Sequence, residues 1–408
     1  MTARVLFDDS RPVTELARQL AGLKSYGDLL FRGERLSERV EAAARAAGWD
    51  EFVRLRDARD LDDELRAIAS GQGADFYLYL PATLGWAGSQ DALESFLKSL
   101  SLAQVTAQVE FETERVVCAR SGAMAEFLAG AHPRRATQGA LSPDLASAQI
   151  KAPPELVNLA SAAGFVTYLT GAFAVRHFNA IENDRYIVKK TSTDRPKLKR
   201  EYAYFTLLPP AMRGYFVNVF DFADDGARAS YKMERILAPD LAIQWVHGAF
   251  DEPAFDKLLD RLFRFLATRE RKTVAREVGR STADALYRDK LTDRLSQLKA
   301  HEAFGRIDSL VRQFPGIAEG LEGLCARYLR LYESLSRNES FDRLEIGHGD
   351  LCFSNILYAP DTELMKFIDV RGAETADDMF TDPLYDLAKL SHSVLGRYDY
   401  INNGLFHV

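Results

Sequence analysis

Apolar and polar positions alternate in two ways along the first 128 residues. Short segments typical of strands lie at 3–8, 51–56 and 76–80, and the last of them is apolar throughout. Stretches with apolar residues at helical spacing lie at 12–23, 36–48, 61–70 and 89–101. Pro81 ends the apolar run at 76–80, and Ser89 has the residue type and the place of a helix N-cap. This alternation of strands and helices predicts an α/β layer structure, to which we assign residues 1–130.

The composition changes between residues 130 and 154. Aromatic residues are absent there, and small residues are interspersed with Pro133, Pro143, Pro153 and Pro154. Segments of this kind have too few apolar side chains to build a core and commonly connect domains. We therefore expect a linker over 131–155.

A second pattern begins at residue 164, with strands first and helices afterwards. The predicted strands are 165–170, 173–179, 186–190, 215–222 and 229–236, with a helix at 197–208 that ends before Pro209-Pro210. Mostly helical sequence follows from 253 to 344, and short strands are predicted at 356–358 and 364–368. A mostly β lobe at 156–236 and a mostly α lobe at 237–408 predict an α+β bilobal, protein-kinase-like domain behind the α/β N-terminal domain.

Charge and composition narrow the class of protein. The net charge of −7 over 408 residues argues against a nucleic-acid partner, which would require a basic surface. No apolar run approaches the roughly 18–20 residues of a membrane span, and the N-terminus lacks the apolar centre of a signal peptide. The three cysteines are far apart, as expected in a reducing compartment. We expect a cytoplasmic protein with no membrane span.

The candidate chemistry lies near the C-terminal end of the sequence. Asp350 and Asn355 have the D-x-x-x-x-N spacing of a kinase catalytic loop, and Asp369 follows the apolar run at 364–368. Phosphoryl transfer needs an oriented acceptor hydroxyl, held phosphates and a neutralising metal ion. Mg²⁺ takes oxygen ligands, so carboxylate and amide side chains suit it. We therefore expect Asp350 to orient the acceptor hydroxyl, Asn355 and Asp369 to bind Mg²⁺, and ATP to be the donor.

These residues carry a resemblance to a known family. The segment HGDLCFSN (348–355), followed by an apolar strand and FIDVRG (367–372), is similar to the aminoglycoside phosphotransferase and choline kinase group of the kinase-like fold. The segment DPLYDLA (382–388) extends the similarity, which covers about 160–400. HGDLCFSNIL with IDVRG also resembles kinases of bacterial capsule loci. The resemblance implies an ATP-dependent kinase whose small-molecule hydroxyl acceptor is a sugar or amino sugar used for a surface polysaccharide.

The resemblance also implies a nucleotide clamp further upstream. The fold uses a strand lysine on the phosphates, paired with a helix glutamate. Lys189 and Lys190 are both candidates for the lysine, and Glu201 is the candidate partner. The phosphate loop is expected at Thr170-Gly171, and the backbone of Met233-Glu234 is expected at the adenine.

Roles for four further residues follow from the same loops. We expect His348 to be structural, and Cys352 and Phe353 to pack in the core. For Arg371 there are two interpretations: it contacts a phosphate, or it supports the loop that carries Asp369.

Two alternatives stay open. In this family the chain continues through further helices after the DPLYDLA segment, whereas here about twenty residues follow Ala388, as expected of a shortened product or a fragment. Together with the single glycine of the phosphate loop, this ending motivates a catalytically silent, nucleotide-binding or regulatory module. A protein kinase is disfavoured, because Gly349 stands where those enzymes have arginine.

The N-terminal domain carries a fainter resemblance. Its stretches at 5–9, 11–14 and 29–40 are similar to the start of sugar-phosphate nucleotidyltransferases, although the G-x-G-x-R run of an active one is absent. A degenerate domain of that kind and a plain α/β scaffold are the two interpretations. On the second, Asp8-Asp9 is a strand-end turn rather than a metal site.

Overall fold

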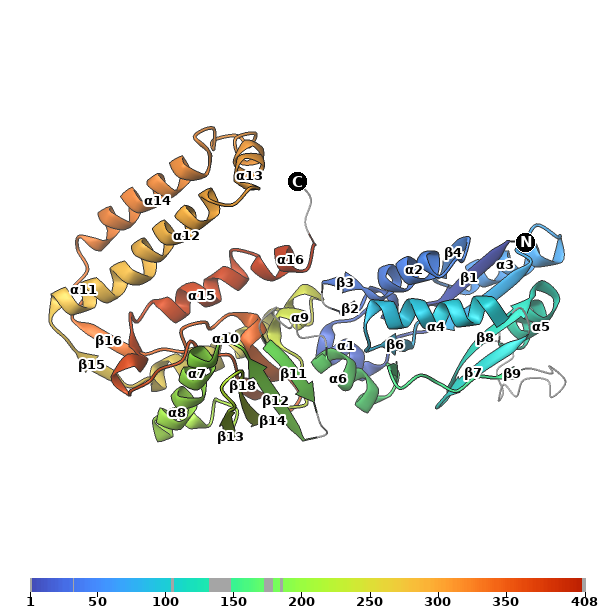
Figure 1. Ribbon diagram of the computed structural model, residues 1–408, viewed down its shortest axis with the longest axis horizontal. Coiled ribbons are helices and arrows are strands. Elements are labelled where there is room, and N and C mark those ends of the chain that lie inside the picture. Colours follow the sequence, from blue (N-terminus) through green and yellow to red (C-terminus); the bar gives the residue numbers. More distant parts are fainter. Residues whose placement is uncertain are drawn as a thin grey trace.

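The protein is described by a computed structural model that covers residues 2–31, 33–103, 106–131, 148–171, 179–183 and 186–405. The described chain is a mixed α/β structure. Its buried apolar side chains gather mainly in two large clusters, one drawn from residues 5–169 and the other from residues 198–390. Figure 1 shows the two corresponding parts of the chain next to each other along the long axis, and we call them the first part and the second part.

The first part is built on a mixed sheet in the order β4-β1-β5-β8-β7-β9. Its strands are β1 (Ala3–Asp8), β4 (Glu51–Leu55), β5 (Phe76–Pro81), β7 (Ala107–Phe111), β8 (Glu114–Arg120) and β9 (Ala148–Gln149). β1 is parallel to β4 and β5, whereas β8 is antiparallel to β5 and β7. The predicted strands at 3–8, 51–56 and 76–80 are confirmed. The β7–β8 hairpin was not predicted.

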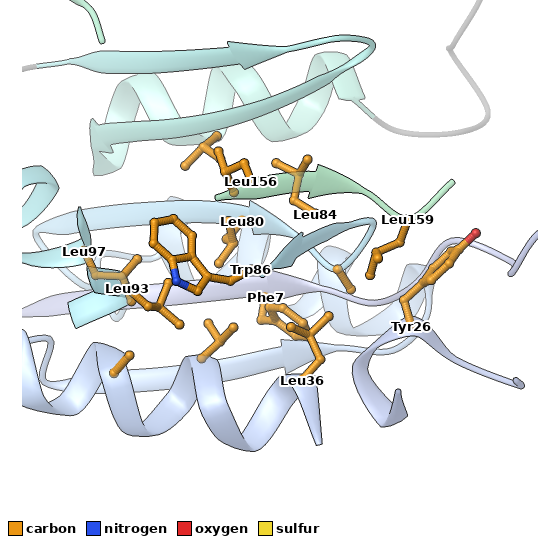
Figure 2. Packing of buried hydrophobic residues seen from close by; sticks show 14 of the residues in the cluster. Phe7, Tyr26, Leu36, Leu80, Leu84, Trp86, Leu93, Leu97, Leu156 and Leu159 are labelled. Atoms are coloured by element: carbon orange, nitrogen blue, oxygen red, sulfur yellow. The ribbon is translucent and has the colours of Figure 1, made fainter. Parts of the chain in front are cut away.

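Helices cover both faces of this sheet. They are α1 (Glu15–Ala21), α2 (Leu36–Ala46), α3 (Ala58–Ala69), α4 (Gln90–Ala103) and α5 (Ser121–Ala131). Because strand side chains alternate, Phe7 and Leu80 pack in the cluster with α2 and α4, while Leu6 packs with α3 and α5. Figure 2 shows Phe7, Leu36, Leu80 and Leu97 in the first cluster. Three of the predicted helices are confirmed. The helix predicted at 12–23 is shorter, because Thr14 caps α1 and Gly22 ends it in a left-handed conformation.

Two acidic residues at the end of β1 are held by structural contacts. Asp9 accepts hydrogen bonds from Arg54 Nε at 2.8 Å and from the Gly27 backbone N–H at 3.1 Å. Asp8 accepts hydrogen bonds from the hydroxyls of Tyr79 and Ser10. These contacts fit the interpretation of Asp8-Asp9 as a strand-end turn.

The segment after the predicted linker packs with the first part. β10 (Leu156–Asn158) pairs with β6 (Leu84–Trp86), and α6 (Ala162–Gly171) follows. The predicted strand at 165–170 is therefore wrong. Ser161 Oγ accepts a hydrogen bond from the Gly164 N–H at 3.0 Å and caps the helix. Phe165, Tyr168 and Leu169, at helical spacing, pack in the first cluster. Most of the strand predicted at 173–179 lies outside the described residues.

The second part begins with an antiparallel sheet in the order β11-β12-β14-β13. The strands are β11 (Asn179–Asn183), β12 (Ile187–Ser192), β13 (Val219–Asp224) and β14 (Ala229–Glu234). Between β12 and β13 come α7 (Arg195–Leu207), which Asp194 caps, and the short α8 (Pro210–Arg213). α7 lies against β12, β13 and β14. The strands predicted at 186–190 and 229–236 and the helix at 197–208 are confirmed. The strand predicted at 215–222 begins later, at Val219, and β11 was not predicted.

The remainder of the second part is mostly helical. Its helices are α9 (Leu241–Val246), α10 (Glu252–Thr268), α11 (Arg276–Asp284), the π-helical turn η2 (Ala285–Asp289), α12 (Lys290–Lys299), α13 (Phe304–Val311), α14 (Gly320–Ser336), α15 (Tyr385–Val394) and α16 (Tyr398–Asn402). Its strands are β15 (Arg271–Thr273), β16 (Arg343–Ile346), β17 (Ile356–Ala359), β18 (Leu364–Phe367) and β19 (Phe380–Thr381). β17 and β18 match the two short predicted strands, whereas β15 and β16 were not predicted. α12, α13 and α14 project from the other elements (Figure 1).

One aromatic cluster joins β18 to α10 and to the segment after α8. Phe367 on β18 lies 4.5 Å from Phe265 on α10, between ring centroids, and 5.4 Å from Phe216. His348 stacks on Phe216. The second hydrophobic cluster therefore continues from α7 and β14 to the loops after β16 and β18.

The two parts of the chain are in contact through α1 and α9. The Leu30 N–H donates a hydrogen bond to His247 Nε2 at 3.3 Å. Gly22, with φ +61°, lies so close to α9 that a Cβ atom on it would be 2.5 Å from the Ala249 nitrogen. Within the described residues, no helix has the length and apolar character needed to cross a membrane.

Candidate active site

A cavity of about 820 Å³ lies in the second part, bordered by β12, α7, α12, α15 and the loops after β16 and β18. Five predicted site residues line it, namely Lys190, Glu201, Asp350, Asn355 and Asp369. The structure therefore brings together side chains that are 179 positions apart along the chain, as in the Lys190–Asp369 pair.

Lys190 forms the centre of one wall of the cavity. Its ammonium group donates to Glu201 Oε2 at 2.6 Å and to Asp369 Oδ1 at 2.8 Å. Lys190 and Glu201 are each 3% exposed. Neighbouring residues on a strand face opposite sides of the sheet, so Lys189 lies on the other face of β12. Of the two candidate lysines, Lys190 is the one in the cavity.

Burial and neighbouring charges shift the pKa values of Lys190 and Glu201. Burial alone would lower the pKa of Lys190, but the attraction of Asp369 and Glu201 raises it above its ordinary value. Burial raises the pKa of Glu201, and the charge of Asp369 adds to this against the attraction of Lys190. Glu201 also lies 4.0 Å from the Lys197 ammonium, so two lysines of this wall approach its carboxylate. The Asp369 side chain is 47% exposed and can be reached from the cavity.

The loop that carries Asp350 is held by Asp386, a completely buried residue of α15. The two carboxylate oxygens of Asp386 accept from the backbone N–H groups of His348 and Gly349, each at 2.9 Å. Arg269, which is paired with Glu345, lies 3.5 Å from the same carboxylate. The second aspartate of the DPLYDLA segment therefore holds the loop that carries Asp350 in place.

His348 is a structural residue of this loop. Its Nε2 is 2.9 Å from the Ile368 carbonyl oxygen, and its Nδ1 accepts from the Asp350 N–H at 3.2 Å. Complete burial lowers the pKa of His348, so the neutral ring is favoured. Gly349 has φ +80°, and a Cβ atom there would be 2.5 Å from Cβ of Arg371. Both features keep the loop against the turn that follows β18.

Asp350 faces the cavity beside Lys389 of α15. Its Oδ1 lies 2.8 Å from the Lys389 ammonium, and both side chains are about a quarter exposed. Burial alone would lower the pKa of Lys389, but the hydrogen bond with Asp350 raises it above its ordinary value. Asn355 donates through Nδ2 to the Asp350 backbone carbonyl at 2.8 Å, which leaves its amide oxygen as the acceptor atom.

Asp369 follows β18 in a left-handed backbone conformation, with φ +57°. Such a conformation is unfavourable for a residue with a side chain, and it is found most often where the surrounding structure or function requires it. Asp369 and Asn355 offer a carboxylate and an amide oxygen, a donor set that suits a hard cation such as Mg²⁺. Across the described ranges, no three His, Cys, Asp or Glu residues form a metal cage. Any metal here would therefore need ligands from water or a bound phosphate.

The remaining predicted residues lie elsewhere. Met233, on β14, is buried in the second hydrophobic cluster, and the Glu234 carboxylate accepts from the Asn218 N–H at 2.9 Å. Thr170 and Gly171 are the last two residues of α6, and their side chains lie outside the description. The loop expected at these positions between two strands is replaced by a helix.

Two residues near Asp350 also border the cavity. Cys352 lines it and is also buried, as expected of a packing residue, and burial raises the pKa of its thiol to about 11. Arg371 lines it too, opposite Gly349.

Sequence reasoning missed the wall opposite Lys190. Residues from η2 and α12 form much of it, and these are Asp289, Lys290, Asp293, Arg294 and Gln297. Lys389, His392 and Tyr398 complete it from α15 and α16. The i, i+4 spacing of polar residues from 289 to 297 was visible, but such spacing is also that of a solvated helix face. Lys389 could have been suspected because it follows Asp386 by three positions, and so shares its helix face.

Comparison with known proteins gave no family for this chain. A scan against protein-family models found no match, and neither did a search of curated proteins.

Proposed function

We propose that this protein is an ATP-dependent, Mg²⁺-requiring phosphotransferase that moves the γ-phosphoryl group of ATP to a hydroxyl group of a small molecule. The observation that carries the proposal is the convergence of Lys190, Glu201, Asp350, Asn355 and Asp369 on one cavity. The order of the elements supports it as well. An antiparallel sheet with a helix against it, followed by a mostly helical region, is the arrangement expected of a bilobal, protein-kinase-like domain.

On this proposal, the donor phosphates lie against Lys190. Glu201 holds the ammonium group from the opposite side, as the fold's lysine–glutamate pair requires. Asp369 and Asn355 would hold Mg²⁺ through a carboxylate and an amide oxygen. When bound, Mg²⁺ supplies positive charge that offsets the negative charge of the phosphates.

Asp350 is the residue that acts on the acceptor. It accepts the proton of the acceptor hydroxyl, while the hydroxyl oxygen forms a bond to the γ-phosphorus. The bond between that phosphorus and the bridging oxygen breaks, and ADP leaves with the electron pair. His348 takes no part in this proton transfer, because both of its ring nitrogens face backbone groups.

The acceptor we propose is a sugar or amino sugar. Asp289, Asp293 and Gln297 border the cavity and offer several hydrogen-bond acceptors to hydroxyl or ammonium groups. His392 and Tyr398, whose rings pack on each other with centroids 4.2 Å apart, add aromatic side chains to the lining of the cavity. A polyhydroxylated ring offers both kinds of surface. The similarity of the catalytic segments to kinases of capsule loci favours the same class.

ADP release tests the proposal directly. Purified protein with ATP and Mg²⁺ is assayed over a panel of neutral sugars, amino sugars and choline. We expect acceptor-stimulated ADP release with at least one sugar, and we expect Asp350→Ala to remove it while ATP still binds. Asp225→Ala, in an exposed turn between β13 and β14, is the control and should behave as wild type. ATP binding without turnover on any acceptor would instead favour the silent nucleotide-binding module.

A further inference from the structure

One face of α15 contacts the catalytic loop at three points. Asp386 accepts from the N–H groups of His348 and Gly349, and Ser393 Oγ accepts from the Phe353 N–H at 3.1 Å. Lys389 lies between these two residues on the same face, at positions i+3 and i−4 from them. A single helix therefore fixes the backbone on both sides of Asp350 and presents a cation to its side chain.

The Lys389–Asp350 pair differs from an ordinary surface ion pair. Its N–O distance is 2.8 Å, and both groups line the cavity with about a quarter of each side chain exposed. Neither α15 nor the loop can move away from the other without breaking the buried contacts of Asp386 and Ser393, which are both fully buried. The pair is thus held in place by its surroundings, so that little side-chain entropy is lost in forming it.

We propose that Lys389 is a positioning residue for the phosphoryl transfer, which holds the Asp350 carboxylate toward the acceptor and places a positive charge where the acceptor oxygen meets the transferred group. This inference rests on the proposed function. The ammonium group has three N–H donors, and its contact with Asp350 uses one oxygen of the carboxylate. The other oxygen is then available to the acceptor hydroxyl.

The positive charge of Lys389 has a role in the proposed transfer step. As the acceptor oxygen loses its proton to Asp350 and bonds to the γ-phosphorus, negative charge is shared among the attacking, transferred and leaving oxygens. Lys190 is bonded to Glu201 and Asp369, on the other wall of the cavity. A fixed cation adjacent to Asp350 stabilises the acceptor side of the same transition state, and a preorganised charge of this kind acts mainly on kcat.

The test compares Lys389→Met, Lys389→Arg and the control Lys257→Met, whose exposed parent residue is on α10 away from the cavity. ADP release with the best acceptor gives kcat and KM, and calorimetry gives the Kd of Mg·ATP. We expect Lys389→Met to lower kcat on the order of 100-fold with Kd within about threefold of wild type. Lys389→Arg should restore at least about tenfold of that loss, because it keeps the charge. Lys257→Met should match wild type.

A double-mutant cycle on the free energy of unfolding supplies a readout that does not depend on turnover. Urea midpoints are measured for Asp350→Asn, Lys389→Met and the double variant, and we expect their effects to be non-additive because each single change removes the same contact. The inference is overturned if Lys389→Met keeps kcat within about twofold of wild type, or if its whole effect is on the Kd of Mg·ATP. Wild-type protein that neither turns over ATP nor transfers phosphate would instead remove the proposed function, and this inference with it.

Discussion

The Asp386→Ala substitution should destabilise the second part of the protein strongly. Asp386 is completely buried, and its two oxygens accept from the His348 and Gly349 N–H groups at 2.9 Å. Removing the carboxylate leaves two buried N–H groups without a partner, and it leaves Arg269 with Glu345 as its remaining ion-pair partner. Breaking a buried charged contact of this kind lowers the free energy of unfolding by about 3–5 kcal/mol.

The assay is urea unfolding followed by tryptophan fluorescence. Trp245 lies 5.7 Å from the ring of Phe353, next to the catalytic loop, whereas Trp49 and Trp86 are in the first hydrophobic cluster. In a Trp245→Phe background the fluorescence reports the first part alone, so the difference from the protein that keeps Trp245 gives the signal of the second part. With a slope of about 2–3 kcal/mol per molar urea, the midpoint of the second part should fall by about 1–2 M. Asp386→Asn, which keeps one acceptor oxygen, should lie in between.

The matched control is Asp377→Ala. Asp377 also accepts from a cation, Lys272, at 2.8 Å, but its side chain is 84% exposed. Exposed pairs add little stability, so we expect no measurable change in the midpoint. If Asp386→Ala shifted the midpoint no more than Asp377→Ala does, the assignment of Asp386 as the clamp of the catalytic loop would be wrong.

Three further predictions concern Lys190 in the cavity wall, Gly349 in the loop that carries Asp350, and the contact between the two parts. Lys190→Met should weaken Mg·ATP binding at least about 100-fold in calorimetry, whereas Lys189→Met, on the other face of β12, should stay within about threefold; equal effects would contradict the assignment. Gly226→Ala should lower the free energy of unfolding by about 1 kcal/mol, because Gly226 has a positive φ but open space around the new Cβ. Gly349→Ala should lower it well beyond that, because Gly349 also has a positive φ and its new Cβ would meet Arg371. Burial lowers the pKa of His247 to about 4, so its neutral form, which accepts from the Leu30 N–H, stabilises the fold above pH 6.5. That stability is lost as the pH falls from 6.5 toward 4, by up to about 3 kcal/mol, since the unfolded chain takes up the proton first. His247→Gln should flatten this part of the stability profile and the exposed control His301→Gln should not, and a parallel profile for His247→Gln would refute the reasoning.

The sequence was sufficient to identify the site residues that lie close together along the chain. Asp350, Asn355 and Asp369 have fixed spacing around one short hairpin, and the structure brings them to the same cavity. The strands at 3–8 and 76–80 were also predictable, because a buried strand is a continuous apolar run with turn residues at its ends. The choice between Lys189 and Lys190 was not, because a shift of one position on a strand reverses the face of every side chain.

Other features depend on packing that one sequence does not contain. The run at 165–170 has the aromatic and β-branched residues of a strand, yet its apolar positions meet the first cluster at helical spacing. Polar residues of α12 were indistinguishable from a solvated face until the fold placed them across from Lys190. The clamp of Asp386 on His348 joins residues 38 positions apart, and only the tertiary structure shows it.

Calorimetric titration with ATP, with and without Mg²⁺, is the measurement that tests the central claim most directly. We expect wild-type protein to bind ATP only when Mg²⁺ is present, Asp369→Ala to lose this binding, and Asp350→Ala to keep it within about threefold, because Asp350 acts on the acceptor. Wild-type protein that fails to bind ATP, or Asp369→Ala that binds Mg·ATP like wild type, would contradict the account.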